Sequence, residues 1–448
     1  MGSGLSSGAG ASVKRRRLAS LLILLLSVGA LSPPAAAPQS APAPVQALVT
    51  SSLAKIASIR GLPSPPTPPP VVIRSRIETR RFVEQEMGRK YPSSRLDAER
   101  KAMVAWGLIP ADFDLRRFLI DLLNEQAVAY YDPTQKVMVL GDWLPPEEQA
   151  TALAHELVHA LQDHQIPLEQ FLSPDPGKGD QLLARQALLE GEAVAISLEL
   201  LLQAQGLDLA RIPALSGIQQ LATALSAGPV FARAPKFLQD LLLFPYIQGL
   251  IFVHQFRLKH SWVDFGQLYR DPPRSTTQLL HPEKFFGRRE DPLLITLPDL
   301  RPILAPAWHL VSEDEMGEWS LRAALEGFLG EATAHRLAEG WRGDRYQIWE
   351  DDKGQLGLIY RVVWEAEERA EAFAQAYAGL LEKKHPALAG KAVAGPGSHW
   401  RWQDGPHSFL VERRGGEVLV LERVPTAAEK PIRQALWAVR SEAPASGR

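Results

Sequence analysis

One five-residue stretch restricts the fold of this chain more than any other feature of its sequence. His155-Glu156-Leu157-Val158-His159 lies within a run whose apolar residues recur at spacings of three, four and seven: Ala150, Leu153, Ala154, Leu157, Val158 and Leu161. This periodicity predicts an amphipathic helix that begins near Pro145. Residues four apart on a helix lie on the same face, so both imidazoles project from one side.

The spacing of these two histidines indicates a metal site. Two imidazole nitrogens one turn apart can reach one ion, and Glu156 then lies next to a water molecule on that ion. The expected chemistry is hydrolysis of peptide bonds by this metal-activated water, with Glu156 as general base. The alternative is a chance match, expected in roughly a few per cent of such chains. The predicted helix and a predicted β-hairpin just before it favour the metal site.

The composition restricts the kinds of ligand. The chain has no cysteine, which excludes a thiol nucleophile, a thiolate metal site and a disulfide framework. A metal must therefore be held by histidine, aspartate or glutamate. With 46% hydrophobic and 22% charged residues the composition is that of a globular protein, and the net charge of −2 gives no indication of a nucleic-acid partner.

A tetrahedral zinc ion held by two histidines needs a third protein ligand. The candidates are Glu190 and Glu192, which lie in an apolar stretch of small residues on a second predicted helix, residues 181–205. Burial of these carboxylates is costly unless a positive charge compensates them, which zinc would do. The small residues, Gly191 among them, would let this helix pack closely against the first. The two glutamates lie about 200° apart around the helix, so only one can face the metal.

The N-terminus is typical of an exported protein. Basic residues 14–17 precede an apolar run, residues 18–31, and a stretch rich in alanine, proline and serine follows. This order predicts a signal peptide over residues 1–47, cleaved after Ala47. The apolar run is shorter than the roughly 20 residues of a spanning helix, although an uncleaved N-terminal anchor is the alternative. We expect a periplasmic or secreted location.

The remaining chain divides into segments that differ in residue composition and in predicted secondary structure. Residues 48–70 are expected to form a proline-rich linker with weak helical character over residues 48–61. Residues 71–311 are expected to form the catalytic domain, and residues 312–448 an α+β accessory domain. Two β-prone runs flank a turn and predict a hairpin over residues 127–140. In the accessory domain we expect strands at 345–349, 357–364, 400–402, 408–413 and 417–423, and helices at 365–382 and 427–439. The fold class is therefore α+β, with a mostly helical core.

On these residues the chain resembles the gluzincin group of zinc metallopeptidases, which pair the HExxH helix with a glutamate on a following helix. In many of them that glutamate leads an ExxA pattern, which here is Glu190-Gly191-Glu192-Ala193. The resemblance implies a zincin-like core, one catalytic zinc ion and Glu190 as its third ligand, with Glu192 as the alternative.

The chain is also similar, from Val71 on, to a set of exported bacterial metallopeptidases whose substrate is undefined. Besides the HExxH segment, four motifs carry this similarity: Glu125-Gln126 before Ala129-Tyr130-Tyr131-Asp132-Pro133, Pro272-Pro273-Arg274-Ser275-Thr276-Thr277-Gln278, His281-Pro282-Glu283-Lys284, and Gly340-Trp341-Arg342-Gly343-Asp344-Arg345-Tyr346. In zincins the strand upstream of the active-site helix aligns the substrate backbone, so the hairpin at 127–140 would do so here.

Three further residues are candidates for roles in the reaction. His281 or Tyr246 could donate a hydrogen bond to a developing oxyanion; the alternatives are a capped turn for His281 and core packing for Tyr246. Asp163 could orient a ligand imidazole, or be a solvated residue near the helix end.

The expected partner is a peptide or protein substrate, without nucleic acid, and with a membrane only through the possible N-terminal anchor. Two other functions compete with the peptidase. One is a zinc hydrolase that acts on cell-wall peptides or non-peptide amides. The other is a non-catalytic zincin-like module for binding or chaperoning, although the retained Glu156 and histidines favour an enzyme.

Overall fold

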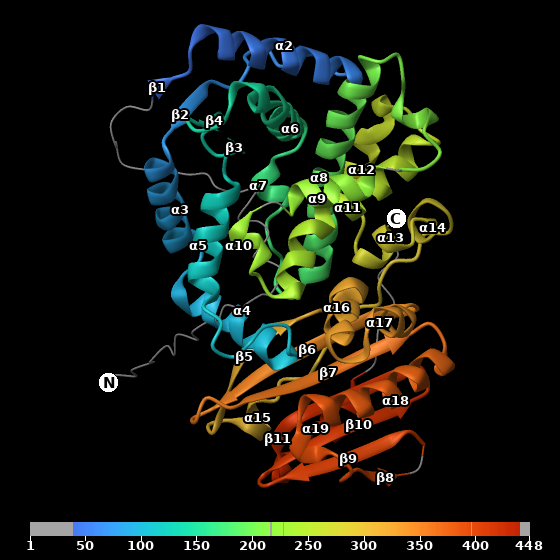
Figure 1. The fold of residues 1–448 in the computed structure, drawn as a ribbon. Coiled ribbons are helices and arrows are strands. Elements are labelled where there is room, and N and C mark those ends of the chain that lie inside the picture. Colours follow the sequence, from blue (N-terminus) through green and yellow to red (C-terminus); the bar gives the residue numbers. More distant parts are fainter. Residues whose placement is uncertain (1–38, 216, 227, 396, 440–448) are drawn as a thin grey trace, which may run out of the picture.

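The computed structural model describes residues 39–439 except 216, 227 and 396 (Figure 1). The expected signal peptide, residues 1–47, lies outside the described residues up to position 38. The described chain forms a helical unit, residues 39–304, and a sheet unit, residues 308–438, which lie one above the other in Figure 1. This mixed architecture confirms the predicted α+β fold class with a mostly helical core.

The helical unit contains a small sheet of four strands in the order β1-β2-β4-β3. The pair β2 and β4 is parallel, and the other two pairs are antiparallel. The pair β3 and β4 is the hairpin predicted for residues 127–140. Strand β3 is an edge strand of the small sheet. The bounds are β1 (Gln39–Ser40), β2 (Val71–Arg74), β3 (Ala129–Asp132) and β4 (Val137–Gly141).

Helices make up the rest of this unit, and two of them confirm the helices predicted around the HExxH motif and residues 181–205. The bounds are α2 (Ala43–Ile59), α3 (Arg76–Lys90), α4 (Ser93–Trp106), α5 (Leu115–Gln126), α6 (Pro146–Gln165), α7 (Leu168–Phe171), α8 (Gly179–Gln203), η2 (Leu209–Arg211), α9 (Ile218–Leu225), α10 (Pro229–Ala232), α11 (Lys236–Arg257), η3 (Trp262–Phe265), α12 (Gly266–Arg270), α13 (Thr276–Leu280), α14 (Glu283–Phe286) and α15 (Arg301–Leu304).

Helix α2 belongs to the folded core, where we expected a linker. It packs against α6 and α8 and crosses the end of the helical unit that lies away from the sheet unit (Figure 1). Its apolar side chains are buried in the main hydrophobic cluster: Val49, Leu53, Ile56 and Ala57. The prediction of a linker over residues 48–70 is therefore wrong for residues 48–59, and the expected cleavage site after Ala47 falls inside α2.

The helices α8 and α11 cross at two glycines. A Cβ atom at Gly191 would lie 2.1 Å from the carbonyl carbon of Gly249, and one at Gly249 would lie 2.0 Å from the carbonyl oxygen of Ala187. Gly191 thus lets α8 approach α11, and not α6 as we expected. Among the described helices, α11 alone is long and apolar enough to cross a membrane, but half of its apolar window is buried in the fold.

The sheet unit is a seven-stranded sheet in the order β5-β6-β7-β11-β10-β9-β8, with every neighbouring pair antiparallel. It confirms the predicted strands and both predicted helices, and its first strand begins at Trp308. The bounds are β5 (Trp308–Asp314), α16 (Gly317–Leu329), α17 (Glu331–Ala338), β6 (Trp341–Asp351), β7 (Leu356–Trp364), α18 (Glu367–Lys384), η4 (Pro386–Leu388), β8 (Val393–Gly395), β9 (His399–Asp404), β10 (His407–Arg414), β11 (Glu417–Pro425) and α19 (Thr426–Ala438).

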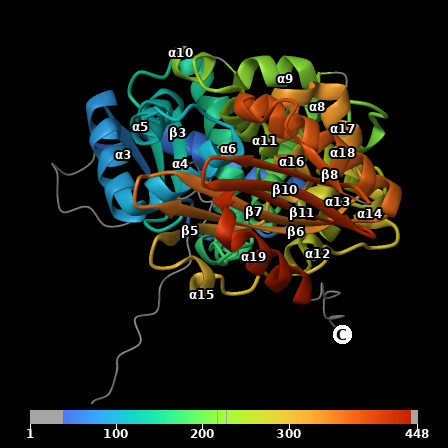
Figure 2. The ribbon, with the colours of Figure 1, turned by 90° about the horizontal axis from the view of Figure 1, so that it is seen from below.

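Both faces of this sheet are covered. Side chains alternate between the faces along a strand, so Val418 and Val420 of β11 join the cluster with α18 while Leu419 and Leu421 join the cluster with α19. Figure 2 shows α18 and α19 on opposite sides of the sheet. The cluster on the α18 side also contains the core of the helical unit, so the two units share one buried core.

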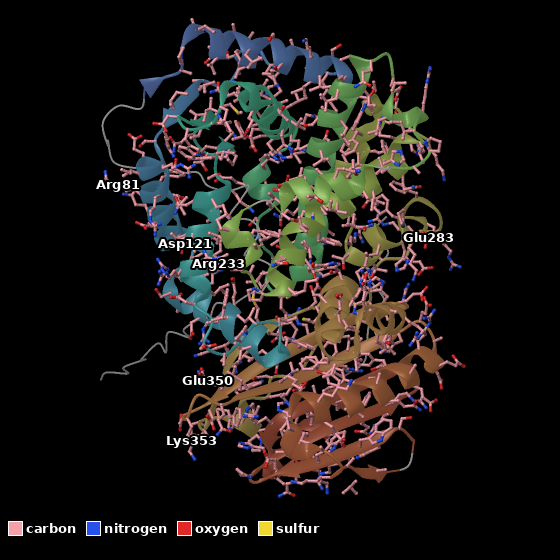
Figure 3. All side chains as sticks on the ribbon, viewed as in Figure 1. Arg81, Asp121, Arg233, Glu283, Glu350 and Lys353 are labelled. Atoms are coloured by element: carbon pink, nitrogen blue, oxygen red, sulfur yellow. The ribbon has the colours of Figure 1, made fainter. Side chains whose placement is uncertain are left out.

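Charged side chains lie mostly at the outside of both units. Arg81, Glu283 and Lys353, labelled in Figure 3, are exposed. Because a charge loses its hydration when it is buried, an ionised carboxylate in the interior needs a compensating partner. Glu190 and Glu192 in the middle of α8 are two buried carboxylates.

Candidate metal centre

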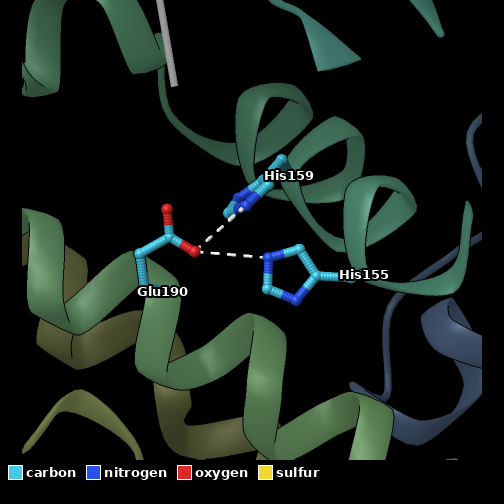
Figure 4. A group of neighbouring side chains, drawn as sticks. All are labelled: His155, His159 and Glu190. Carbon is cyan, nitrogen blue, oxygen red and sulfur yellow. Dashed lines mark hydrogen bonds and ion pairs between the residues drawn. The ribbon is translucent and has the colours of Figure 1, made fainter. Parts of the chain in front are cut away.

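Helices α6 and α8 bring three possible metal ligands together. The Nε2 atoms of His155 and His159 lie 3.3 Å and 3.5 Å from Oε2 of Glu190. Figure 4 shows this one carboxylate oxygen facing both rings. One ligand atom from each of the three residues lies within 4.8 Å of the others. The helical spacing of the two histidines and the crossing of α8 therefore produce a group that can surround a single ion.

The three side chains differ in their access to solvent. The side chain of His155 is 22% exposed, whereas those of His159 and Glu190 are 3% and 2% exposed. Glu190 lies in the middle of α8, where the flanking residues are buried against α11. A ligand that enters from solvent therefore approaches the group from the side of His155.

The electrostatics of the group suit a cation. Burial alone would raise the pKa of Glu190, but His159 and the hydrogen bonds to both imidazoles lower it to about 2. Burial opposes protonation of His159, yet Glu190 outweighs it and raises the pKa of this imidazole to about 9. The buried carboxylate thus requires positive charge beside it. Two imidazole nitrogens and one carboxylate oxygen are a donor set that fits a zinc ion, which would supply that charge.

The carboxylate of Glu156 lies between the small sheet and α6. Its Oε2 accepts a hydrogen bond of 3.0 Å from the backbone N–H of Tyr131 in β3. Burial raises the pKa of Glu156, and the nearby imidazoles of His159 and His155 oppose this rise in part. A raised pKa makes the carboxylate a better proton acceptor, as a general base requires.

Tyr246, one of the residues considered for the oxyanion, also lies at this group. Its ring centroid is 6.1 Å from that of His155, and its hydroxyl lies near the carboxylates of Glu190 and Glu156. Burial raises the pKa of the hydroxyl well above its usual value, and the negative charges of Glu190 and Glu156 raise it further. The phenol therefore stays protonated and can donate a hydrogen bond.

The other two candidates, His281 and Asp163, form hydrogen bonds with residues outside this group. The Nε2 atom of His281 is 2.7 Å from Oε1 of Glu318, so this imidazole joins α13 to α16 and is not part of the cluster with Glu190. Asp163 accepts hydrogen bonds from the Tyr131 hydroxyl at 2.8 Å and from Lys136. Its expected role of orienting a ligand imidazole is therefore not supported by its contacts.

Gln162 contacts the Nδ1 atom of His159, the ring nitrogen that does not face Glu190. This residue was not among those expected from the sequence. Its Oε1 lies 2.8 Å from Nδ1 of His159. The spacing of three residues on a helix was the available signal, because side chains three apart are neighbours. Glu192 is not part of the cluster with the imidazoles and contacts Gln162, Arg60 and Tyr269.

Comparisons with known proteins cover two segments of the chain. The model of a peptidase family, described as the IrrE N-terminal-like domain, matches residues 112–233, which contain β3, β4, α6 and α8. The model of a domain of unknown function, DUF8575, matches residues 308–433, nearly all of the sheet unit. The curated proteins and the solved structures gave no match. The segment that carries the HExxH motif is therefore similar to a zincin-like, metallopeptidase-related family, which supports the general kind of protein that the motif indicates.

Proposed function

We propose that this chain is a zinc-dependent peptidase, with His155, His159 and Glu190 as the protein ligands of one zinc ion. The observation that carries this proposal is the single Glu190 oxygen that lies within 3.5 Å of both imidazole Nε2 atoms. Three protein ligands of this type are those of catalytic zinc sites, which keep one position open. Zinc, when bound, would supply Lewis acidity to a water molecule and to a carbonyl oxygen.

Glu156 then acts as the general base. The hydrogen bond from the Tyr131 N–H fixes one carboxylate oxygen, which leaves the other free to take a proton. During attack on a peptide carbonyl, this carboxylate accepts the proton of the water and later passes it to the leaving amine nitrogen. The raised pKa of Glu156 brings it closer to the range in which both transfers are possible.

Tyr246 is the donor to the developing oxyanion in this proposal. Its hydroxyl lies near Glu190 and stays protonated, so it can donate a hydrogen bond to a substrate oxygen. The edge strand β3 lies beside the base, which favours an extended peptide as the substrate. We also propose that the enzyme acts outside the cytoplasm, because of the signal-like residues 14–31.

The Glu156→Gln variant separates catalysis from binding. Its amide oxygen can still accept the Tyr131 N–H but cannot take a proton, so zinc content is expected to stay unchanged. Hydrolysis of a fluorogenic peptide library by the zinc-loaded protein should fall by roughly 10²- to 10⁴-fold. Equal hydrolysis by both proteins would contradict the role of Glu156, and zinc binding without hydrolysis by the unmodified chain would favour a non-catalytic binding module.

A further inference from the structure

A buried series of hydrogen bonds leads from His159 to the N-terminal helix α2. Nδ1 of His159 lies 2.8 Å from Oε1 of Gln162, and Nε2 of Gln162 lies 2.8 Å from Oε2 of Glu192. The other oxygen of Glu192 accepts a hydrogen bond of 2.5 Å from Nε of Arg60, the residue directly after α2. Tyr269 of α12 also donates to Glu192. These contacts connect a proposed metal ligand to a residue 132 positions before Glu192.

The acceptors around Gln162 determine how its amide is oriented. Its Nε2 group donates to the backbone oxygen of Leu189 at 2.9 Å and to Glu192 at 2.8 Å. Neither of these oxygens can donate, so both amide hydrogens point at them and the amide oxygen faces His159. An amide oxygen only accepts, so Nδ1 of His159 must carry a hydrogen. In a neutral imidazole the other nitrogen, Nε2, then has the free lone pair that a metal needs.

Arg60 holds the carboxylate of Glu192 in place, so that it can accept the hydrogen bond from Gln162. Both side chains are 1% exposed, and Arg60 also donates to the backbone oxygen of Trp262. The guanidinium lies 4.9 Å from the ring centroid of Phe265 and 5.8 Å from that of Trp262. A buried carboxylate that loses its cationic partner is left uncompensated. Glu192 would then rearrange, and Gln162 would lose the acceptor that orients its amide.

We propose that Arg60 is a positioning residue of the metal centre, which acts through Glu192 and Gln162 to fix the tautomer and orientation of His159. This inference rests on the proposed zinc site. It also assigns a role to the segment that we expected to be a linker. Arg60, directly after α2, supplies the positive charge that holds Glu192 beside Gln162, the residue that contacts His159. Loss of that charge should weaken zinc binding although Arg60 does not touch the metal.

The test compares the zinc dissociation constants of full-chain variants, measured by competition with a chelator. Arg60→Met is expected to bind zinc about 10- to 100-fold more weakly, as is typical when an outer contact of a metal ligand is lost. The matched control is Arg361→Met, which removes a similarly buried arginine, 3% exposed, from its pair with Glu417 in the sheet unit. This control should bind zinc with unchanged affinity.

A double variant and a spectroscopic measurement distinguish positioning from loss of stability. Arg60→Met combined with Glu192→Gln removes both charges and keeps an acceptor for Gln162, so zinc affinity should recover relative to Arg60→Met alone. In ¹⁵N-histidine spectra of zinc-loaded protein, the Nδ1–H of His159 should exchange slowly in the unmodified chain and rapidly in Arg60→Met.

Each outcome has a different meaning. Equal zinc affinity and equal Nδ1–H exchange in Arg60→Met would overturn the positioning role and leave the zinc site intact. Equal weakening in Arg60→Met and Arg361→Met, or no recovery in the double variant, would overturn it as well, because the effect would then reflect loss of stability. Absence of zinc binding by the unmodified chain would instead overturn the proposed function.

Discussion

The backbone N–H of Tyr131 donates a 3.0 Å hydrogen bond to Oε2 of Glu156. This contact connects the edge strand of the small sheet to the helix that carries both histidines. It holds one oxygen of the proposed base in place without using a side chain. The strand that would lie beside a peptide substrate and the group that would take the proton are therefore fixed relative to each other.

The hydroxyl of Tyr246 should contribute to the rate of hydrolysis and little to zinc binding. Tyr246→Phe keeps the ring next to His155 and removes the donor. We expect kcat for a peptide substrate to fall by roughly 10²- to 10³-fold, the cost of one oxyanion donor, with KM and zinc content nearly unchanged. Steady-state kinetics and metal analysis of the same preparation test this. An unchanged kcat would show that Tyr246 only packs against the site.

The close crossing of α8 and α11 should make Gly191 intolerant of any side chain. In Gly191→Ala the new Cβ would collide with backbone atoms of Gly249, which cannot move as a flexible side chain can. The free energy of unfolding should fall by about 3 kcal/mol or more, at the upper end of overpacking. The control is Gly379→Ala in α18, where the new methyl group would meet no neighbouring side chain or strand within 4 Å.

That control removes a glycine from a helix interior, so it should be neutral or stabilising by up to about 1 kcal/mol. Chemical denaturation of both variants provides the comparison. Equal stability of Gly191→Ala and the unmodified chain would show that α8 and α11 do not cross as closely as described.

Asp180 in the first turn of α8 should make stability depend on pH. Burial raises its pKa to about 8, although hydrogen bonds from Thr276 oppose the rise and the charges of Asp344 and Glu318 add to it. Between about pH 4 and pH 8 the folded state keeps a proton that the unfolded state has released. The stabilising contribution is therefore complete below about pH 4 and is lost as the pH rises through about 8.

Asp180→Asn cannot ionise and should remove part of this dependence. We expect the loss of unfolding free energy between about pH 5.5 and about pH 8.5 to be smaller in the variant by about 1 kcal/mol or more, since one pKa unit corresponds to about 1.4 kcal/mol. Denaturation at both pH values measures it, with the exposed Asp175→Asn as control. The same pH dependence in all three proteins would contradict the raised pKa of Asp180.

Local patterns predicted much of the fold and the centre of the candidate site. The apolar stripe around His155 and His159 marked α6, and the turn residues before Lys136 marked the hairpin, because both signals lie within one element. The ExxA resemblance singled out Glu190, and the structure places this residue, and not Glu192, against the imidazoles. Each of these predictions depends on neighbours in sequence.

The missed features depend on contacts between distant segments. Arg60 contacts Glu192 across 132 residues, and Gly191 contacts Gly249 on a third helix, which no periodicity within one helix can reveal. The apolar residues of α2 give only a weak helical signal in the sequence, because their burial depends on α6 and α8. The sequence alone does not show that His281 has a structural partner, because Glu318 lies 37 positions later on α16. Without that partner, His281 is a candidate for a catalytic role.

The most direct test of the zinc site is the metal content of purified full chain beside two variants of α8. Glu190→Gln removes the proposed ligand, and Glu199→Gln changes an equally buried glutamate of the same helix, which accepts a hydrogen bond from the Leu209 N–H. After supply of zinc and removal of excess, elemental analysis should find about one zinc per chain in the unmodified protein and in Glu199→Gln, and little in Glu190→Gln. Absence of zinc from the unmodified chain, or full retention by Glu190→Gln, would contradict the proposed site.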